Sequence, residues 1–402
     1  MKAVVFHAVG DIRVDDVPEP VIQDSTDAIV RLTASAICGT DLHFVRGSMS
    51  GMKPGTILGH EGVGVVEEIG EDVRNLEVGD RVVICSTIGC GSCGYCRAGY
   101  YAQCQNANPN GPAAGTSFFG GPEATGPFDG LQAELARIPY AHVTCVKLPD
   151  EVADDDALLI SDIFPTAWFG ARLADVSDGD VVAVFGAGPV GMFAILSAQL
   201  QGAGRVLCVD QIASRLEQAR GLGAETVDFS AEDPVQTLKR LTGGTGPDRI
   251  IDAVGIDAES PGDERSEEFS GEVDELAPEQ PDEGSRFRRP GDAPSQALRW
   301  EVDAIAPAGT LGIIGVYPPA AEHFPIGMAM NKNLTLKMGN CNHRRYVPEL
   351  VELVRSGAVR PAAIVSQIGD LTDAIDAYQT FDRRADGWHK VALDPTAVRE
   401  QL

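Results

Sequence analysis

The first 150 residues contain short apolar runs that are separated by turn residues. Runs at residues 28–34, 64–69 and 81–85 are broken by Gly, Pro or Asp, and residues 1–7 have the same character. Short apolar runs bounded by turn signals are typical of β-strands. The first part of the chain is therefore predicted to be rich in β-structure.

From about Asp154 onward, apolar strand-like runs alternate with helical stretches. The expected strands are Val181–Phe185, Arg205–Asp210, 250–254, 310–315 and 389–393, and the expected helices are 190–201, 214–222 and 348–356. The central strands are apolar throughout, which indicates a parallel sheet covered by helices on both faces. Because 402 residues exceed one ordinary core, two domains are expected.

Residues 257–299 interrupt this alternation. The segment is rich in Pro, Ser and Gly and carries thirteen acidic residues against five arginines. We expect a long polar insertion that lies outside the core.

The overall composition limits the class of protein. Residues 1–7 lack a signal peptide's apolar region, and no apolar run is long enough to cross a bilayer, so we expect a cytoplasmic protein. A net charge of −27 would repel nucleic acids and anionic membranes. The acidic excess indicates either a salt-adapted (halophilic) host or an ordinary acidic enzyme.

Four closely spaced cysteines predict a structural metal site. Nine cysteines without an export signal favour metal ligation or free thiols over disulfides. The spacing C-x2-C-x2-C-x7-C is formed by Cys90, Cys93, Cys96 and Cys104. Four thiolates fill all four positions of a tetrahedral Zn²⁺ ion, which makes the site structural. An iron–sulfur cluster is the alternative, but the typical iron–sulfur motif ends in C-x3-C-P, which is absent here.

A second pair of metal-binding residue types lies upstream of this loop. Cys38 precedes Gly39, and twenty-two residues later His60 stands between Gly59 and Glu61. Each residue alone is more often a buried structural side chain. Together they indicate the thiolate and imidazole ligands of a zinc site.

A glycine motif predicts a dinucleotide site. The strand Val181–Phe185 runs into G-x-G-x-x-G, and an acid follows nineteen residues later at the end of the next strand; the residues are Gly186, Gly188, Gly191 and Asp210. Such glycines let the backbone approach a pyrophosphate at a helix N-terminus, and the carboxylate accepts hydrogen bonds from the ribose. The carboxylate would repel a 2′-phosphate, so NAD is expected over NADP. Arg215 is either a further ribose contact or a solvated helix residue.

These motifs together resemble the zinc-containing alcohol dehydrogenases of the medium-chain dehydrogenase/reductase superfamily. C-G-T-D-x-H at 38–43, G-H-E-x-x-G-x5-G at 59–70 and the four-cysteine loop carry the resemblance. The family's usual third cysteine ligand is absent, and Asp162 occupies its place within S-D-I-x-P-T. This replacement and the insertion resemble the glutathione-independent formaldehyde dehydrogenase branch.

The resemblance implies an α/β fold with two domains. A β-rich GroES-like catalytic domain would span 1–155, with its structural zinc loop at about 90–104. A Rossmann NAD-binding domain with a doubly wound parallel sheet would span 156–343, and 344–402 would return to the catalytic domain.

The resemblance also implies roles for individual residues. Cys38, His60 and Asp162 would hold the catalytic zinc, Glu61 would be a transient ligand, and Asp41 would orient His60. Thr40 would accept a proton that His43 carries to solvent. Thr166 and Val190 would pack on the nicotinamide.

The expected reaction is hydride transfer between NAD and a small alcohol or aldehyde, with formaldehyde among the candidates. In the formaldehyde dehydrogenase branch the insertion retains NAD and permits aldehyde dismutation. A polyol or secondary-alcohol dehydrogenase, or a catalytically silent nucleotide-binding protein, are the alternatives. We expect two zinc ions per chain and a homodimer or homotetramer.

Overall fold

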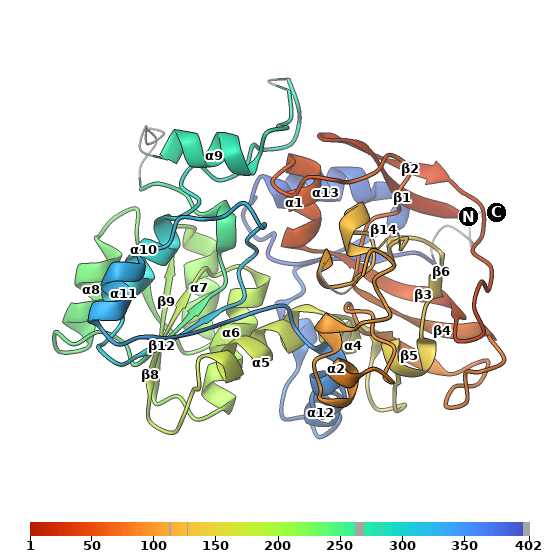
Figure 1. Ribbon diagram of the computed structural model, residues 1–402, viewed down its shortest axis with the longest axis horizontal. Helices are drawn as coiled ribbons and strands as arrows, with labels where there is room; N and C mark the ends of the chain where they lie inside the picture. Colours follow the sequence, from red (N-terminus) through yellow and green to blue (C-terminus); the bar gives the residue numbers. More distant parts are fainter. Residues whose placement is uncertain (112–113, 127, 262–268, 283, 397–402) are drawn as a thin grey trace. The chain divides into compact units, whose positions relative to one another are not determined.

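The computed structural model describes residues 1–111, 114–126, 128–261, 269–282 and 284–396 (Figure 1). The chain forms two compact units. Unit 1 comprises Met1–Pro165, Glu279–Arg289 and Cys341–Leu402, and unit 2 comprises Thr166–Pro278 and Pro290–Asn340. Within the described residues, no helix is both long and apolar enough to cross a membrane.

Unit 1 is built on a seven-stranded sheet in which β14–β15–β3–β4–β5–β7 are successive neighbours and β6 also pairs with β3. All pairs except β14–β15 are antiparallel. The strands are β3 (Ala28–Ile37), β4 (Gly62–Ile69), β5 (Arg81–Ile84), β6 (Leu135–Ile138), β7 (Cys145–Lys147), β14 (Gln367–Asp370) and β15 (Val391–Asp394). A separate antiparallel ribbon joins β1 (Lys2–Ala8) and β2 (Asp11–Asp16).

Strands β3 and β4 approach each other closely where their register shifts. A Cβ on Gly64 would lie 2.3 Å from the carbonyl oxygen of Arg31, so only glycine fits there. The register shifts between Ile29 and Val30 and again, next to Gly64, between Leu32 and Ala34. This irregularity lies a few residues before the end of β3, where the chain turns into the first helix.

The helices of unit 1 are short and connect the strands. They are α1 (Gly39–Arg46), α2 (Gly94–Arg97), α3 (Ala141–Thr144), α4 (Asp154–Ile160), α12 (His343–Arg355) and α13 (Ala374–Asp382), with 3-10 turns at Tyr101–Gln103, Glu123–Thr125, Pro361–Ile364 and Leu371–Asp373. The expected helix at 348–356 begins five residues earlier than predicted. Pro348 lies inside α12, where its ring removes one helical hydrogen bond without ending the helix.

Unit 2 contains a six-stranded, entirely parallel sheet with the order β10–β9–β8–β11–β12–β13. This is the strand order of a doubly wound nucleotide-binding fold. Its strands are β8 (Val181–Phe185), β9 (Arg205–Asp210), β10 (Glu225–Asp228), β11 (Arg249–Asp252), β12 (Thr310–Ile313) and β13 (Thr335–Met338). The expected parallel sheet is confirmed, although the strands predicted at 250–254 and 310–315 end two residues earlier.

Unit 2 also contains helices, several of which pack on its sheet. They are α5 (Ile163–Leu173), which starts in unit 1, α6 (Pro189–Leu200), α7 (Ala213–Gly221), α8 (Pro234–Leu241), α9 (Ser270–Leu276), α10 (Gln296–Ala304) and α11 (Ile326–Asn331), with a 3-10 turn at Gly255–Asp257. Helix α10 contacts both α8 and α11, and the three lie together beside the sheet in Figure 1. Because both sheet faces are covered, β8 is apolar throughout and buried from its second residue onward.

The prediction that 257–299 lies outside the core is wrong for part of the segment. Phe287 is only 7% exposed and belongs to the same apolar cluster as Phe44 and Tyr378 of unit 1. The backbone N–H of Arg288 donates to Asp382 Oδ2 at 2.6 Å. One aromatic side chain buries enough apolar area to anchor a polar segment to the core. The polar composition of the whole segment does not reveal this single residue. Residues 262–268 and 283 lie outside the described residues.

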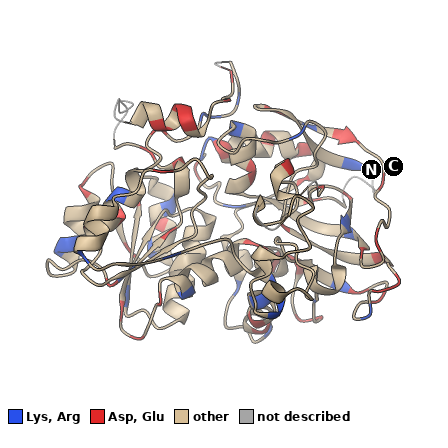
Figure 2. Cartoon of the chain, in the orientation of Figure 1, with Lys and Arg blue, Asp and Glu red and all other residues tan. Residues whose placement is uncertain are grey.

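Acidic groups are spread over both units (Figure 2). Helix α9, which lies within the insertion, contains three acidic residues: Glu272, Asp274 and Glu275. Basic side chains lie between the acids on other helices and loops (Figure 2). Several of them pair with acids at the surface, as Lys2 does with Asp16 at 2.7 Å.

Candidate metal and nucleotide sites

Four candidate metal ligands from three segments of unit 1 meet in the structure. Cys38 follows β3 and caps α1, His60 and Glu61 immediately precede β4, and Asp162 lies between α4 and α5. One ligand atom of each residue lies within 4.8 Å of the others. The structure therefore brings together residues that are up to 124 positions apart in the sequence.

The distances in this cluster fit one zinc ion. Asp162 Oδ2 lies 3.8 Å from Cys38 Sγ and 3.5 Å from His60 Nε2. Ligands about 2.0–2.3 Å from a tetrahedral zinc ion stand roughly 3.3–3.8 Å from each other. A thiolate, an imidazole and a carboxylate are also a competent zinc donor set.

Asp41 organises the two ligands beside it. Its Oδ2 accepts a hydrogen bond from the backbone N–H of Cys38 at 2.9 Å and one from Gln132 Nε2 at 3.3 Å. Its Oδ1 lies 3.3 Å from His60 Nδ1, the ring nitrogen remote from Asp162. Tyr378 in turn donates to Gln132 Oε1 at 2.8 Å. Asp41 thus holds the backbone of Cys38 and lies beside the ring of His60, and its expected orienting role stays a prediction.

A fully buried ion pair stands next to the cluster. Glu61 and Lys390 are both 0% exposed, and Lys390 Nζ donates to Glu61 Oε1 and, at 3.0 Å, to the carbonyl of Ile37. The antiparallel register pairs Val391 with Ile37, so the preceding residue reaches the end of β3. Burial raises the pKa of Glu61. Burial acts to lower the pKa of Lys390, but Glu61, Cys38 and Asp162 together outweigh burial and raise that pKa.

His343 is a further neighbour of Asp162. Its Nε2 lies 2.9 Å from Asp162 Oδ1, and its Nδ1 lies 2.8 Å from Thr87 Oγ1. Burial acts to raise the pKa of Asp162, yet hydrogen bonds with His343 and His60 hold it well below its usual range. Burial acts to lower the pKa of His343, but Cys341 and Asp162 raise it to about 10.

Neither Lys390 nor His343 was singled out from the sequence. A lysine directly before the apolar strand run 391–393 is a usable signal, because a charge at the start of a buried strand needs a partner. His343 stands among polar residues in Asn340-Cys341-Asn342-His343, which carries no comparable signal.

The four loop cysteines form the second candidate metal cluster. Their sulfur atoms also lie within 4.8 Å of one another, with Cys93 Sγ and Cys104 Sγ 4.0 Å apart. Backbone N–H groups donate to these sulfurs, as Cys90 N does to Cys104 Sγ at 3.3 Å. Burial acts to raise the pKa of Cys90, but hydrogen bonds from Ser92 and Cys93 lower it to about 6. A thiolate at neutral pH suits a metal ligand.

The two residues expected to move a proton lie on the first turns of α1. Thr40 is half-buried, and His43 is 5% exposed. His43 therefore lies inside unit 1, on the same short helix as Thr40, and its role in passing a proton to solvent through the nicotinamide ribose stays a prediction.

The glycine motif of unit 2 has the backbone that a phosphate loop requires. Gly186 has a φ of +89°, and a Cβ on Gly191 would lie 1.8 Å from the carbonyl oxygen of Gly186. Asp210 is buried at the end of β9, where its Oδ2 accepts from Ala187 N at 2.7 Å. A Cβ on Gly188 would lie 3.8 Å from Arg215 Nη1, so this arginine reaches the glycine loop.

The remaining expected cofactor contacts also lie in unit 2. Thr166 is near the start of α5, and Val190 is in the first turn of α6, directly after the glycine loop. Both are half-buried.

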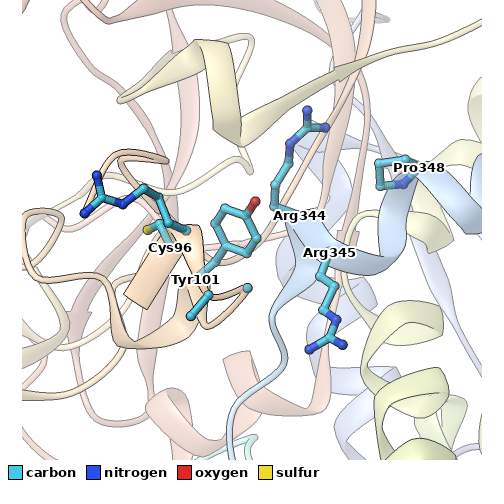
Figure 3. A pocket seen from close by; sticks show the side chains of 8 residues that line it. Cys96, Tyr101, Arg344, Arg345 and Pro348 are labelled. Atoms are coloured by element: carbon cyan, nitrogen blue, oxygen red, sulfur yellow. The ribbon is translucent and has the colours of Figure 1, made fainter. Parts of the chain in front are cut away.

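A pocket of about 490 Å³ in unit 1 lies away from the candidate catalytic ligands. It is lined by Cys96, Tyr101 and neighbouring residues of the cysteine loop and by Arg344, Arg345 and Pro348 of α12. The guanidinium groups of Arg344 and Arg345 point in different directions (Figure 3). Because these cations do not converge and none of Cys38, His60 and Asp162 lines the pocket, we do not assign the chemistry to it.

Comparison with known proteins places the chain in a family. Residues 24–150 match the alcohol dehydrogenase GroES-like domain, and residues 189–260 match the zinc-binding dehydrogenase family. A zinc-type alcohol dehydrogenase-like protein of Bacillus subtilis is 36% identical over 98% of this chain and 100% of its own length. The glutathione-independent formaldehyde dehydrogenase of Pseudomonas aeruginosa is 30% identical over 98% of this chain and 97% of its own length.

A solved structure agrees with these matches. The alcohol dehydrogenase TADH from Thermus sp. ATN1 has a TM-score of 0.80 at 34% identity, covering 98% of this chain and 99% of that one. The expected superfamily, the expected pair of domain folds and the expectation of an enzyme are confirmed. The chain therefore belongs to the zinc-dependent medium-chain alcohol dehydrogenase family and is an oxidoreductase that uses zinc and NAD(H).

Proposed function

We propose that Cys38, His60 and Asp162 hold the catalytic zinc and that the loop cysteines hold a second, structural zinc. The observation that carries this assignment is the convergence in unit 1 of a thiol and an imidazole on one carboxylate oxygen, which lies 3.8 Å from Cys38 Sγ and 3.5 Å from His60 Nε2. Three protein ligands leave one position open for substrate, whereas four thiolates leave none. The two sites therefore have different tasks.

The residues around the first site balance its charge. Cys38 and Asp162 supply two negative charges opposite a dication, and Lys390 compensates Glu61 in the same buried region. A zinc ion held there by Cys38, His60 and Asp162 would supply a Lewis acid, which would polarise a substrate oxygen and lower the pKa of a substrate hydroxyl. Among the described residues, Glu61 Oε2 has no hydrogen-bond partner, and this supports the role of transient ligand that the family resemblance implies for Glu61.

Proton and hydride transfer require further groups from each unit. Thr40, in the first turn of α1 directly after Cys38, accepts the hydroxyl proton in this proposal. NAD accepts the hydride when bound, and the protein supplies its orientation. Gly186, Gly188 and Gly191 cradle the pyrophosphate, and the Asp210 carboxylate favours NAD over NADP by repelling a 2′-phosphate.

The substrate class proposed is a small primary alcohol or its aldehyde, with formaldehyde included. The carboxylate at position 162 and the 30% identity to a formaldehyde dehydrogenase over nearly the whole chain support this choice. We further propose adaptation to salt, which rests on the net charge of −27. A cytoplasmic homo-oligomer is proposed from the family resemblance alone.

Substrate profiling tests the proposal directly. The purified protein is offered methanol, ethanol, formaldehyde, a secondary alcohol and a polyol with NAD, and NADH formation is followed in low and high salt. The proposal expects the highest kcat/KM with a small primary alcohol or aldehyde hydrate, and higher activity in high salt. A clear preference for the polyol or the secondary alcohol would refute the substrate assignment.

A further inference from the structure

The two carboxylate oxygens of Asp162 have different surroundings. Oδ2 faces the other candidate ligands, 3.5 Å from His60 Nε2 and 3.8 Å from Cys38 Sγ. Oδ1 lies 2.9 Å from His343 Nε2, on a ring that is 4% exposed. One oxygen is therefore directed to the metal position, and the other is held by a buried histidine.

The far side of the His343 ring is anchored as well. The hydroxyl of Thr87 donates to the carbonyl of Cys341 at 3.0 Å, and its oxygen lies 2.8 Å from His343 Nδ1. Because a hydroxyl has a single proton, its oxygen is left to accept from Nδ1. Thr87 follows β5 and His343 begins α12, so two elements far apart in sequence fix the plane and position of this ring.

We propose that His343 is a positioning residue that keeps Asp162 a one-oxygen zinc ligand by holding its Oδ1. The inference rests on the proposed role of Asp162 as the third ligand. A free carboxylate binds a metal through one oxygen or through both. With Oδ1 held by His343, only Oδ2 is available, and the position that substrate needs stays open.

An aspartate at this place needs a partner for its second oxygen, whereas a cysteine does not. A thiolate has one donor atom and cannot bind through two. A carboxylate brings a second oxygen that is buried with it, and a buried anionic oxygen without a donor is costly. Partners that orient metal ligands contribute about 10–100-fold to metal affinity or activity. With one hydrogen bond, His343 both supplies a donor to the buried Oδ1 and keeps Oδ1 away from the metal.

The test compares His343→Leu with His343→Gln in the purified holoenzyme. Leu removes the donor, whereas Gln is of similar size and retains an N–H at the end of its side chain. Zinc affinity of the first site is measured by chelator competition. The coordination number is measured from the visible absorption of Co²⁺ exchanged into that site, because these bands weaken when four ligands become five. Retention of the loop zinc reports that each variant is folded.

We expect His343→Leu to lower metal affinity about 10–100-fold and to weaken the Co²⁺ bands. His343→Gln should recover most of both, and Thr87→Val should have a smaller effect in the same direction. An unchanged affinity and spectrum in His343→Leu would overturn the inference, and so would equal effects of Leu and Gln. If His343→Leu loses both metals, Thr87→Val is the deciding variant. A lower metal affinity and weaker Co²⁺ bands in Thr87→Val would then support the inference, and unchanged values would overturn it.

Asp162→Ala separates this inference from the proposed function. If that variant keeps two metals per chain, the ligand assignment itself is wrong. If it loses one metal while His343→Leu behaves as the unmodified protein, the ligand assignment stands and only the role of His343 is refuted.

Discussion

Replacing Lys390 by Met should destabilise unit 1 strongly. Lys390 and Glu61 are both 0% exposed and pair with each other, so the variant leaves a buried carboxylate without its cation. Removing one partner of a buried ion pair costs about 3–5 kcal/mol. For a unit of 150–250 residues, each kcal/mol lowers the melting temperature by about 2–4 °C. The expected decrease is therefore about 6–20 °C.

The pH dependence of this loss has a definite sign. Burial raises the pKa of Glu61 even with Lys390 present, and removal of the cation raises it further. In the variant, folded Glu61 then holds a proton that the unfolded chain has lost, so stability falls as pH rises, by at most about 1.4 kcal/mol per pH unit. The destabilisation should be larger at pH 8 than at pH 5.

The assay is thermal unfolding of Lys390→Met, Glu61→Gln and the double variant at both pH values. The double variant should be more stable than Lys390→Met alone, because no charge is left unpaired. Surface variant Lys2→Met is the control, since its partner Asp16 is exposed. A decrease below about 2 °C for Lys390→Met at pH 8 would show that the buried pair does not stabilise the fold as argued.

Four further predictions concern the other sites. Cys104→Ser should reduce the zinc content to one per chain and make the loop at 90–104 sensitive to protease, as metal analysis and limited digestion would show; full metal content would contradict it. Glu301→Met should raise stability by about 1–3 kcal/mol, because neither oxygen of this buried side chain has a hydrogen-bond partner among the described residues. Burial raises the pKa of Glu301 well above its usual range, so the native form holds a proton that the unfolded chain loses above pH ~4.3, and the gain should be larger at pH 8 than at pH 5 in urea unfolding. Asp210→Ser should narrow the preference for NAD over NADP about 10-fold or more in kcat/KM, and an unchanged ratio would remove the residue from cofactor selection. If the insertion retains the cofactor, heat-denatured protein should release NAD into the supernatant. A supernatant without NAD would refute cofactor retention by the insertion.

The sequence predicted the unit 2 sheet well because its strands are buried on both faces. The runs Val181–Phe185 and Arg205–Asp210 match β8 and β9 residue for residue. The glycine motif was recognisable because its spacing expresses a backbone requirement, visible here as the positive φ of Gly186 and the close contact at Gly191. A backbone requirement of this kind involves residues that are close in sequence, so the sequence motif alone can reveal it.

The metal site was predictable only in part. Cys38, His60 and Asp162 were found through motifs and resemblance, and the structure brings them together. Lys390 and His343 act through tertiary contacts with residues 329 and 181 positions away, respectively. No local pattern encodes such contacts. Phe287 was overlooked for the related reason that one buried aromatic is hidden within a polar segment.

The pairing of β15 with β3 has a consequence for biosynthesis. A nascent chain that has reached Asn340 already contains Cys38, His60 and Asp162, but it lacks both His343 and Lys390. Until translation passes Asp394, the edge of β3 has no β15 beside it, and the Glu61 carboxylate has no cation. The whole of unit 2 is synthesised in this interval. Metal bound before that point would be held without these supporting residues, and the completed site forms only after unit 2 has been synthesised.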